Sequence, residues 1–302
     1  MQRIAILLAA TFLGCRGHDD TAPIAMRTVT APDGTTIEVP VTVTNVYATN
    51  AAALDVLVAI ADRSQIQALP ATAFEYSSLA DDPEPWRDLK QMTNVDTEDI
   101  LALDPDLVLI HDWQSPTQGA WLRENGIAMM VLPTVTKWEH ITDSVNAVAD
   151  ALGRQDAGDA LIADLEARRA RLAERTAGSE PMRAMTYGNY GGDGSSSGSN
   201  TTWHLMFELA GLTNAGAEDG AEGVYEIDIE RLLVLDPDLL LVSENLEGVS
   251  PAIGTLRAHP SAQGLRALQK DQIVSLPAWL YSTSTLRLLD AAEMLVDRLD
   301  RN

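Results

Sequence analysis

A serine between two glycines is the residue in this sequence with the clearest catalytic potential. The segment Gly194-Ser195-Ser196-Ser197-Gly198 matches the Gly-x-Ser-x-Gly pattern of hydrolases, in which an exposed serine attacks an acyl carbon. Ser196 would be that nucleophile, and His204 is the nearest histidine in sequence that could accept its proton. The hydrolase turn needs a strand that runs directly into its first glycine, whereas residues 191–193 intervene here in a glycine- and serine-rich loop. A serine hydrolase is therefore one alternative function.

Histidines offer a second possible chemistry, the binding of a transition metal. No two of them have the His-x-His or His-x-x-x-His spacing that brings two imidazoles to one ion. A receptor for a bare transition metal is thus a further alternative. Its candidate ligands are His111, His140, His204 and His259.

A sixteen-residue repeat organises the elements that would position these side chains. Residues 95–110 and 227–242 agree at nine positions, including a shared Leu-Asp-Pro-Asp-Leu core. In each copy Asp96 or Asp228 is suited to cap a short helix, the proline ends that helix, and an unbroken apolar run predicts a buried parallel strand. Two such units, 132 residues apart, predict two similar α/β lobes.

Other patterns complete this division of the chain, and they include a predicted strand from Val41 to Tyr47 and a predicted loop over residues 70–91. Asp33-Gly34 between alternating residues predicts a hairpin, and residues 156–176 predict one long helix because they are rich in Ala, Leu, Arg and Glu and contain no proline. We expect that helix to be a rigid connection about 30 Å long. The expected units are a signal peptide at 1–15, a tether at 16–27, a first lobe at 28–155, a connecting helix at 156–178 and a second lobe at 179–302.

Composition and the N-terminus narrow the function further. A formal net charge of −23 over 302 residues argues against nucleic acid as a partner. The apolar run Ile4 to Leu13 is a secretory signal core that is too short to span a membrane. The segment Phe12-Leu13-Gly14-Cys15, which holds the only cysteine of the chain, resembles the lipobox of bacterial lipoproteins. The resemblance implies an extracytoplasmic protein that is anchored through a lipid on Cys15. An ordinary signal peptide with an incidental cysteine is the alternative.

The order of these features, together with Glu208-Leu-Ala-Gly-Leu-Thr-Asn214, resembles the substrate-binding lipoproteins of ABC importers for cobalamin, ferric siderophores and haem. The resemblance covers about residues 28–299. It implies an α/β fold of two similar lobes with mainly parallel sheets, joined by a single long helix, with the ligand cleft between the lobes. It also implies a monomeric, non-enzymatic receptor with no cofactor of its own, whose Glu98 and Glu230 pair with arginines of the membrane permease.

Aromatic residues mark the expected ligand site. In open α/β lobes, ligands bind beyond the carboxyl ends of the strands, and most loops expected there carry a Trp or Tyr. Flat rings suit a large, partly apolar ligand, and the scarcity of basic residues near them (Arg87, Lys90 and Lys137) favours cobalamin or another weakly charged chelate over a catecholate siderophore. Haem stays open, with His111 or a tyrosine as axial ligand. The predicted ligand-binding residues are Tyr47, Tyr76, Trp86, Trp113, Trp138, Tyr187, Tyr190, Trp203, Trp279 and Tyr281.

Overall fold

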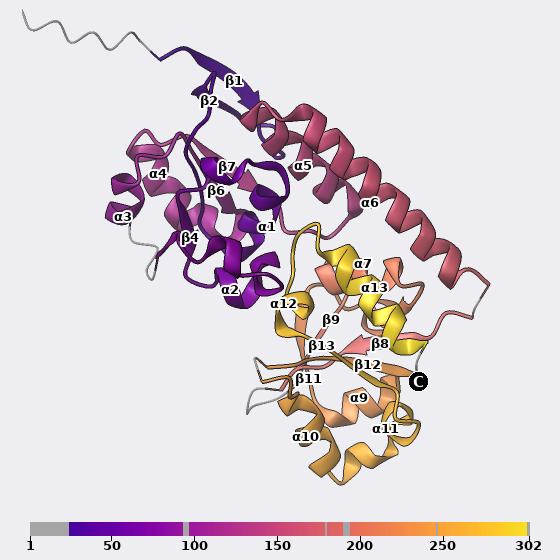
Figure 1. Ribbon diagram of the computed structural model, residues 1–302. Helices are drawn as coiled ribbons and strands as arrows, with labels where there is room; N and C mark the ends of the chain where they lie inside the picture. The colour runs from indigo at the N-terminus through magenta and orange to yellow at the C-terminus, as the bar shows by residue number, and fades with distance from the viewer. Residues whose placement is uncertain (1–23, 93–96, 179, 190–193, 246, 301–302) are drawn as a thin grey trace, which may run out of the picture.

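The computed structural model describes residues 24–92, 97–178, 180–189, 194–245 and 247–300. Figure 1 shows two α/β lobes that lie side by side, with one long helix, α6, running along both of them. Helix α6 spans Gln155–Thr176. We call the part of the chain before α6 lobe one and the part after it lobe two. The predicted fold class is confirmed.

The N-terminal hairpin forms where the sequence predicts it. Strands β1 (Met26–Thr30) and β2 (Thr36–Pro40) pair antiparallel. Gly34 has a φ of +81° in the turn between them, a backbone conformation that glycine adopts without steric cost.

Lobe one is built on a parallel sheet with strand order β3-β6-β7. The first repeat supplies helix α3 (Thr97–Ala102) and the central strand β6 (Leu107–His111). All five residues of β6 are buried, as the unbroken apolar run predicts. The remaining elements of this sheet and its helices are β3 (Val46–Ala48), α1 (Ala51–Ile60), α4 (Ala120–Glu124), β7 (Met129–Leu132) and α5 (Trp138–Leu152).

Two predictions for lobe one are wrong in their bounds. Strand β3 covers only Val46–Ala48 instead of beginning at Val41. The stretch 70–91, predicted as a loop, contains the short helix α2 (Ala73–Tyr76). It also contributes most of β5 (Lys90–Met92), which pairs in parallel with β4 (Ala68–Pro70). Between α2 and β5 lie two short 3-10 helices, η2 (Ser78–Ala80) and η3 (Glu84–Trp86).

Lobe two repeats the plan with strand order β10-β8-β12-β13, all pairs parallel. The second repeat supplies α9 (Ile229–Leu235) and the buried strand β12 (Leu239–Ser243), again inside the sheet. The other elements are β8 (Arg183–Thr186), α7 (Thr202–Leu209), β10 (Thr213–Asn214), α8 (Ala215–Glu218), α10 (Pro251–Ala258), α11 (Arg266–Gln269), β13 (Ile273–Leu276), α12 (Ala278–Tyr281) and α13 (Leu288–Leu299).

The glycine- and serine-rich stretch of lobe two is partly a strand, which corrects the prediction of a loop. Strand β9 (Gly194–Ser197) pairs antiparallel with β11 (Val224–Ile227). A Cβ on Gly194 would lie 2.6 Å from Cε2 of Tyr187, so the small residue lets the strand lie against that ring. The sequence hid this strand because glycine and serine are poor strand formers.

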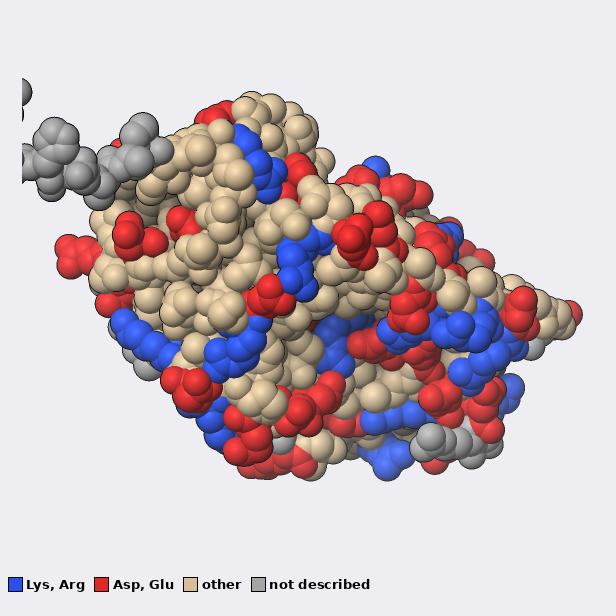
Figure 2. Space-filling model, turned by 45° about the horizontal axis from the view of Figure 1, so that its top comes forward, with Lys and Arg blue, Asp and Glu red and all other residues tan. Residues whose placement is uncertain are grey.

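Packing between α5, α6 and lobe two holds the lobes together. Val135, Trp138 and Ile141 of lobe one share a hydrophobic cluster with Leu165 of α6 and with α13. Acidic and basic side chains are interspersed on the face drawn in Figure 2. Within the described ranges, no helix combines the length and the apolar composition needed to cross a bilayer.

Candidate functional site

The carboxyl ends of the parallel strands face the space between the lobes, and there the two lobes touch. Helix α2 of lobe one contacts α12 of lobe two. We call this region the interlobe site. Four of the predicted aromatic residues lie in the contacting helices or line the adjoining pocket of lobe two, and Trp113 follows the carboxyl end of β6 in lobe one. The four are Tyr76, Trp203, Trp279 and Tyr281.

Trp113 is the most exposed aromatic side chain of the lobe-one wall. Its side chain follows β6 and is 64% exposed, and its ring stacks on His111 with the centroids 6.1 Å apart. Asp112 fixes this turn, because its carboxylate accepts hydrogen bonds from the backbone N–H and the hydroxyl of Thr134, both at 2.7 Å. Burial acts to raise the pKa of Asp112, but hydrogen bonds from His111 and Thr134 hold it well below its usual range. Trp113 is thus an exposed ring on a fixed, anionic turn.

The lobe-two wall contains a pocket of about 190 Å³ beside two aromatic rings. Trp203 begins the first turn of α7, and its indole Nε1–H donates a hydrogen bond of 2.9 Å to the carbonyl oxygen of Tyr281. The centroids of the Trp203 and Tyr281 rings are 5.5 Å apart, and the ring planes make an angle of 50°. This contact fixes both rings at the edge of the pocket.

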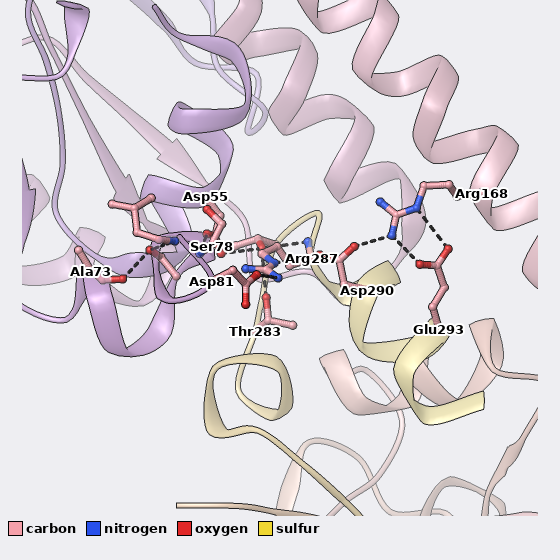
Figure 3. Close-up of polar contacts among 12 residues, drawn as sticks. Asp55, Ala73, Ser78, Asp81, Arg168, Thr283, Arg287, Asp290 and Glu293 are labelled. Atoms are coloured by element: carbon pink, nitrogen blue, oxygen red, sulfur yellow. Dashed lines mark hydrogen bonds and ion pairs between the residues drawn. The ribbon is translucent and has the colours of Figure 1, made fainter. Parts of the chain in front are cut away.

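Arg287 joins the two walls at the base of the interlobe site (Figure 3). Its guanidinium donates hydrogen bonds of 2.9 Å to Asp81 of lobe one and to Asp290 of α13. It also lies 4.3 Å from the ring centroid of Trp279, a distance at which a cation is attracted to an aromatic face. The Arg287 side chain is only 9% exposed, so this ion pair is shielded from solvent on one side.

Asp55 is a buried carboxylate next to Arg287, contributed by α1 (Figure 3). It accepts a hydrogen bond of 2.6 Å from the backbone N–H of Ser78 and one of 3.3 Å from the hydroxyl of Thr285 in lobe two. Burial raises the pKa of Asp55 to about 6, although Ser78 and Arg287 act to lower it. Sequence reasoning missed this contact, and the available signal was the single aspartate in the apolar run Ala51–Ile60.

Two of the predicted ligand-binding tyrosines lie in the hydrophobic cores instead, and this corrects the prediction. Tyr47 is fully buried in the middle of β3, and burial raises the pKa of its phenol. Tyr187 is 1% exposed and packs with Met185 and Ile227. For Tyr47 the error follows from the misplaced strand, which put this residue at the strand end instead of inside it.

Two further predicted residues, Trp138 and Trp86, pack elsewhere, and a third lies outside the described residues. Trp138 is 6% exposed at the start of α5, and its indole N–H donates a hydrogen bond of 2.5 Å to Glu166 of α6. Trp86 packs against the lobe-one core with the Arg63 guanidinium 5.2 Å from its ring centroid. Tyr190 lies outside the described residues.

The geometry around Ser196 does not match a hydrolase nucleophile. Ser196 is 3% exposed inside strand β9, and its hydroxyl donates a hydrogen bond of 2.7 Å to the carbonyl oxygen of Thr186. His204 is next to Glu208, with 3.5 Å between Nε2 and the carboxylate, and makes no hydrogen bond to Ser196 in the described part of the chain. A nucleophile elbow needs an exposed serine at a strand-to-helix turn, so the pattern match is a coincidence of composition.

Two of the histidines proposed as metal ligands have polar partners within lobe one. His111 is 1% exposed with Nδ1 3.0 Å from Asp112, and Nδ1 of His140 lies 2.8 Å from the carbonyl oxygen of Thr134. Among the residues that the structure describes, no three His, Cys, Asp or Glu side chains are grouped as metal ligands. His111 is too deeply buried to reach a ligand's iron without rearrangement.

Glu98 and Glu230 occupy equivalent places in the two lobes. Each lies in the first turn of a repeat helix, α3 or α9, and each is exposed. Neither forms an ion pair or hydrogen bond with another described residue. Asp228 caps α9 as predicted, accepting a hydrogen bond of 2.6 Å from Arg231 N, whereas Asp96 lies outside the described residues.

A helix-joined pair of α/β lobes with aromatic walls between them defines the class of two-lobed ligand receptors. Residues 46–280 match the periplasmic binding protein family, and this chain belongs to that family. A cobalamin-binding protein of Halobacterium salinarum is 25% identical over 172 residues, which are 57% of this chain and 46% of that protein. An Fe(3+)-citrate-binding protein of Bacillus subtilis is 23% identical over 231 residues, covering 72% of this chain and 65% of the relative.

Solved structures agree with the fold. A periplasmic binding protein of Veillonella parvula superimposes with a TM-score of 0.78 at 13% identity, covering 93% of this chain and 99% of the other. At that identity the likeness concerns the fold. The chain spans about half the length of the cobalamin-binding relatives that it matches.

Proposed function

We propose that this protein is an extracytoplasmic solute-binding protein that captures a corrinoid or an iron chelate between its lobes and delivers it to an ABC permease. The observation that supports the proposal is the interlobe site, to which both lobes contribute aromatic side chains from elements that follow the carboxyl ends of parallel strands. Relatives named for cobalamin and ferric citrate support this choice of ligand class. Its action is binding and release, and we assign it no catalysis and no cofactor of its own.

Delivery to a permease is part of the same proposal. Glu98 and Glu230 are exposed, unpaired in the described structure and symmetry-related by the repeat. Two equivalent carboxylates suit a partner built of two equivalent subunits that presents arginines.

Attachment to the membrane rests on the N-terminal sequence. We propose that Cys15, which lies outside the described residues, carries a lipid and that residues 16–27 link it to a monomeric receptor composed of 28–155, the 156–178 helix and 179–302. The replacement Cys15→Ser should release the protein from membranes into the soluble fraction. Retention of this variant in the membrane fraction would contradict lipidation at this residue.

The binding proposal is tested by titrating the purified full-length protein with cobalamin, haemin and ferric hydroxamate, citrate and catecholate complexes while following tryptophan fluorescence. We expect saturable quenching by at least one of them at micromolar or lower concentration. Trp113→Ala should weaken that affinity about tenfold, because the variant loses an exposed stacking ring. Trp121→Phe, on α4 and outside the interlobe site, is the matched control and should leave affinity unchanged. No saturable binding of any of these chelates would refute the proposal.

A further inference from the structure

The pocket in the lobe-two wall has a chemical character of its own. It lies at the carboxyl end of β8 and beside the end of α12, the helix that contacts lobe one, and β9, β11 and the start of α7 complete it. Among the described residues that line it, none is Asp, Glu, Lys, Arg or His. The lining consists of hydroxyl groups, rings and small residues: Thr186, Gly188, Ser195, Ser196, Ser197, Trp203, Val224, Tyr281 and Ser282.

Hydrogen bonds within the wall fix the deeper hydroxyl groups. Ser196 donates to the carbonyl oxygen of Thr186 at 2.7 Å, and the hydroxyls of Ser197 and Thr186 lie 2.8 Å apart. The hydroxyls nearer the opening make weaker hydrogen bonds, or none, to described residues. That of Ser195 lies 3.5 Å from the carbonyl oxygen of Gly188, and that of Ser282 has no hydrogen bond to a described residue. The pocket therefore has a preformed floor and two hydroxyls left for a ligand.

The size of the pocket limits what can enter. The pocket has a volume of about 190 Å³. A whole corrin or porphyrin does not fit in such a space, whereas one side arm of such a ligand can enter it. The pocket is thus a subsite for one arm of a ligand whose main body rests against the rings outside it.

The described residues of the lining include no cation, and this indicates which ligand side arms fit the pocket. A carboxylate placed here would lose its water without gaining an Arg, Lys or His partner, which is strongly unfavourable. An amide has both a donor and an acceptor, and hydroxyl groups can satisfy both. The lining therefore matches an uncharged, hydrogen-bonding group.

We propose that this pocket receives an uncharged amide-sized arm of the cargo, and hence that the cargo is an amide-bearing corrinoid or a similarly uncharged chelate. This inference rests on the proposed function of the interlobe site. It separates such ligands from chelates with carboxylate arms, such as haem and ferric citrate.

The test uses two ligands that differ by one charge. The full-length protein is titrated at pH 7 with cyanocobalamin and with the acid obtained by hydrolysing one of its side-chain amides, for each available position of hydrolysis. We expect the acid hydrolysed at the buried arm to bind at least tenfold more weakly than cyanocobalamin. The other acids serve as internal controls, because their charge stays in solvent.

A variant at the rim of the pocket should change the relative affinities for cyanocobalamin and the acid without altering the floor of the pocket. Ser282→Arg adds a cation at the exposed rim and should strengthen binding of the sensitive acid about tenfold relative to cyanocobalamin. Ser64→Arg, exposed in lobe one and outside the pocket, changes the net charge equally and should shift neither affinity.

The outcomes distinguish the two proposals. If every acid binds as tightly as cyanocobalamin, or if haemin or ferric citrate binds and cyanocobalamin does not, the inference about the pocket is wrong and the receptor function stands. If none of these chelates binds, the proposed function fails and the inference fails with it.

Discussion

The two lobes contain the same turn, and the second aspartate of that turn has the same role in both. In lobe one, Oδ2 of Asp106 accepts hydrogen bonds from the backbone N–H groups of Thr44, at 2.7 Å, and Asn45, at 3.0 Å, just before strand β3. In lobe two, Oδ2 of Asp238 accepts one of 3.1 Å from the N–H of Arg183, which begins β8. The repeated motif thus holds the start of the neighbouring strand, and this explains why its second carboxylate is present in both copies.

The first aspartate is supported differently in the two lobes. Asp104 and Asp236 both have positive φ, 48° and 39°, ahead of the proline. Arg266 bridges Asp236 at 2.6 Å and Asp238 at 2.7 Å, and this contact holds the pKa of Asp236 below its usual range although burial acts to raise it. The carboxylate of Asp104 has no such partner in the described structure. The positive φ of the first aspartate and the role of the second aspartate are therefore common to both lobes, whereas the ion pair with Arg266 is found only in lobe two among the described residues.

The ligand-facing walls differ more than the turns. Lobe one presents Trp113 on an anionic turn, and lobe two presents an uncharged pocket beside Trp203. A fold made of two similar halves therefore has Glu98 and Glu230 at equivalent positions of its repeat and a site between the lobes whose two walls differ. Under the proposed function, the equivalent glutamates would suit a two-fold partner and the differing walls an asymmetric ligand.

Charge reversal at both glutamates should have the largest effect of the variants discussed below. The double variant Glu98→Lys/Glu230→Lys replaces two exposed carboxylates by cations that repel the arginines of a permease. We expect uptake of the ligand by cells to fall at least a hundredfold, with the ligand affinity of the purified protein unchanged. Each single variant should give an intermediate loss, because one lobe still docks.

The control for this experiment keeps the same change in net charge. Glu124 on α4 and Glu174 on α6 are exposed, and the described structure gives neither an ion pair. Glu124→Lys/Glu174→Lys should transport normally. Loss of ligand binding in the Glu98/Glu230 variant would contradict a docking role for these residues.

Asp55 at the contact between the lobes should make stability depend on pH. Because the pKa of this buried carboxyl is raised to about 6 from 3.8, the folded state holds a proton that the unfolded state releases, and stability falls as pH rises from about 4 to about 6. Above that range the ionised group costs about 3 kcal/mol, at 1.36 kcal/mol for each pKa unit. Asp55→Asn should therefore be more stable than the native protein at pH 7 to 8 by up to this amount, with little difference at pH 4.

Urea denaturation between pH 4 and pH 8 measures this effect. Asp143→Asn, an exposed carboxyl on α5, is the control and should follow the native protein at every pH. A difference between Asp55→Asn and the native protein that stays constant with pH would show that Asp55 is ionised throughout.

The central elements of the fold could be predicted from the sequence because they follow from local chemistry. The Leu-Asp-Pro-Asp-Leu core specifies a helix end and a buried strand within a few residues, and α6 begins at Gln155, one residue before the predicted start. The hairpin at Asp33-Gly34 is similarly local. These patterns need no knowledge of the rest of the molecule.

The site was predictable only in part, because side-chain exposure depends on contacts between distant segments. Tyr47 and Trp113 both lie near strand ends in sequence, yet one is fully buried and the other is 64% exposed. Strand β9 is stabilised by its pairing with β11, about thirty residues away, and no local propensity indicates it. The contact between Arg287 and Asp81 joins residues from different lobes, and nothing in either local sequence indicates the other.

Removing the shared carboxylate should test whether each lobe supports its own strand. Asp106→Ala leaves the N–H groups of Thr44 and Asn45 without their acceptor, so we expect a loss of about 2 kcal/mol in the free energy of unfolding. Hydrogen exchange localises the effect: amides of β3 should exchange faster in Asp106→Ala, and amides of β8 should exchange faster in Asp238→Ala. Each variant is the control for the other, because both remove the same group from equivalent turns. Equal acceleration in both lobes from either variant would mean that the lobes unfold as one cooperative unit, joined through α6 and the shared core of Trp138 and α13.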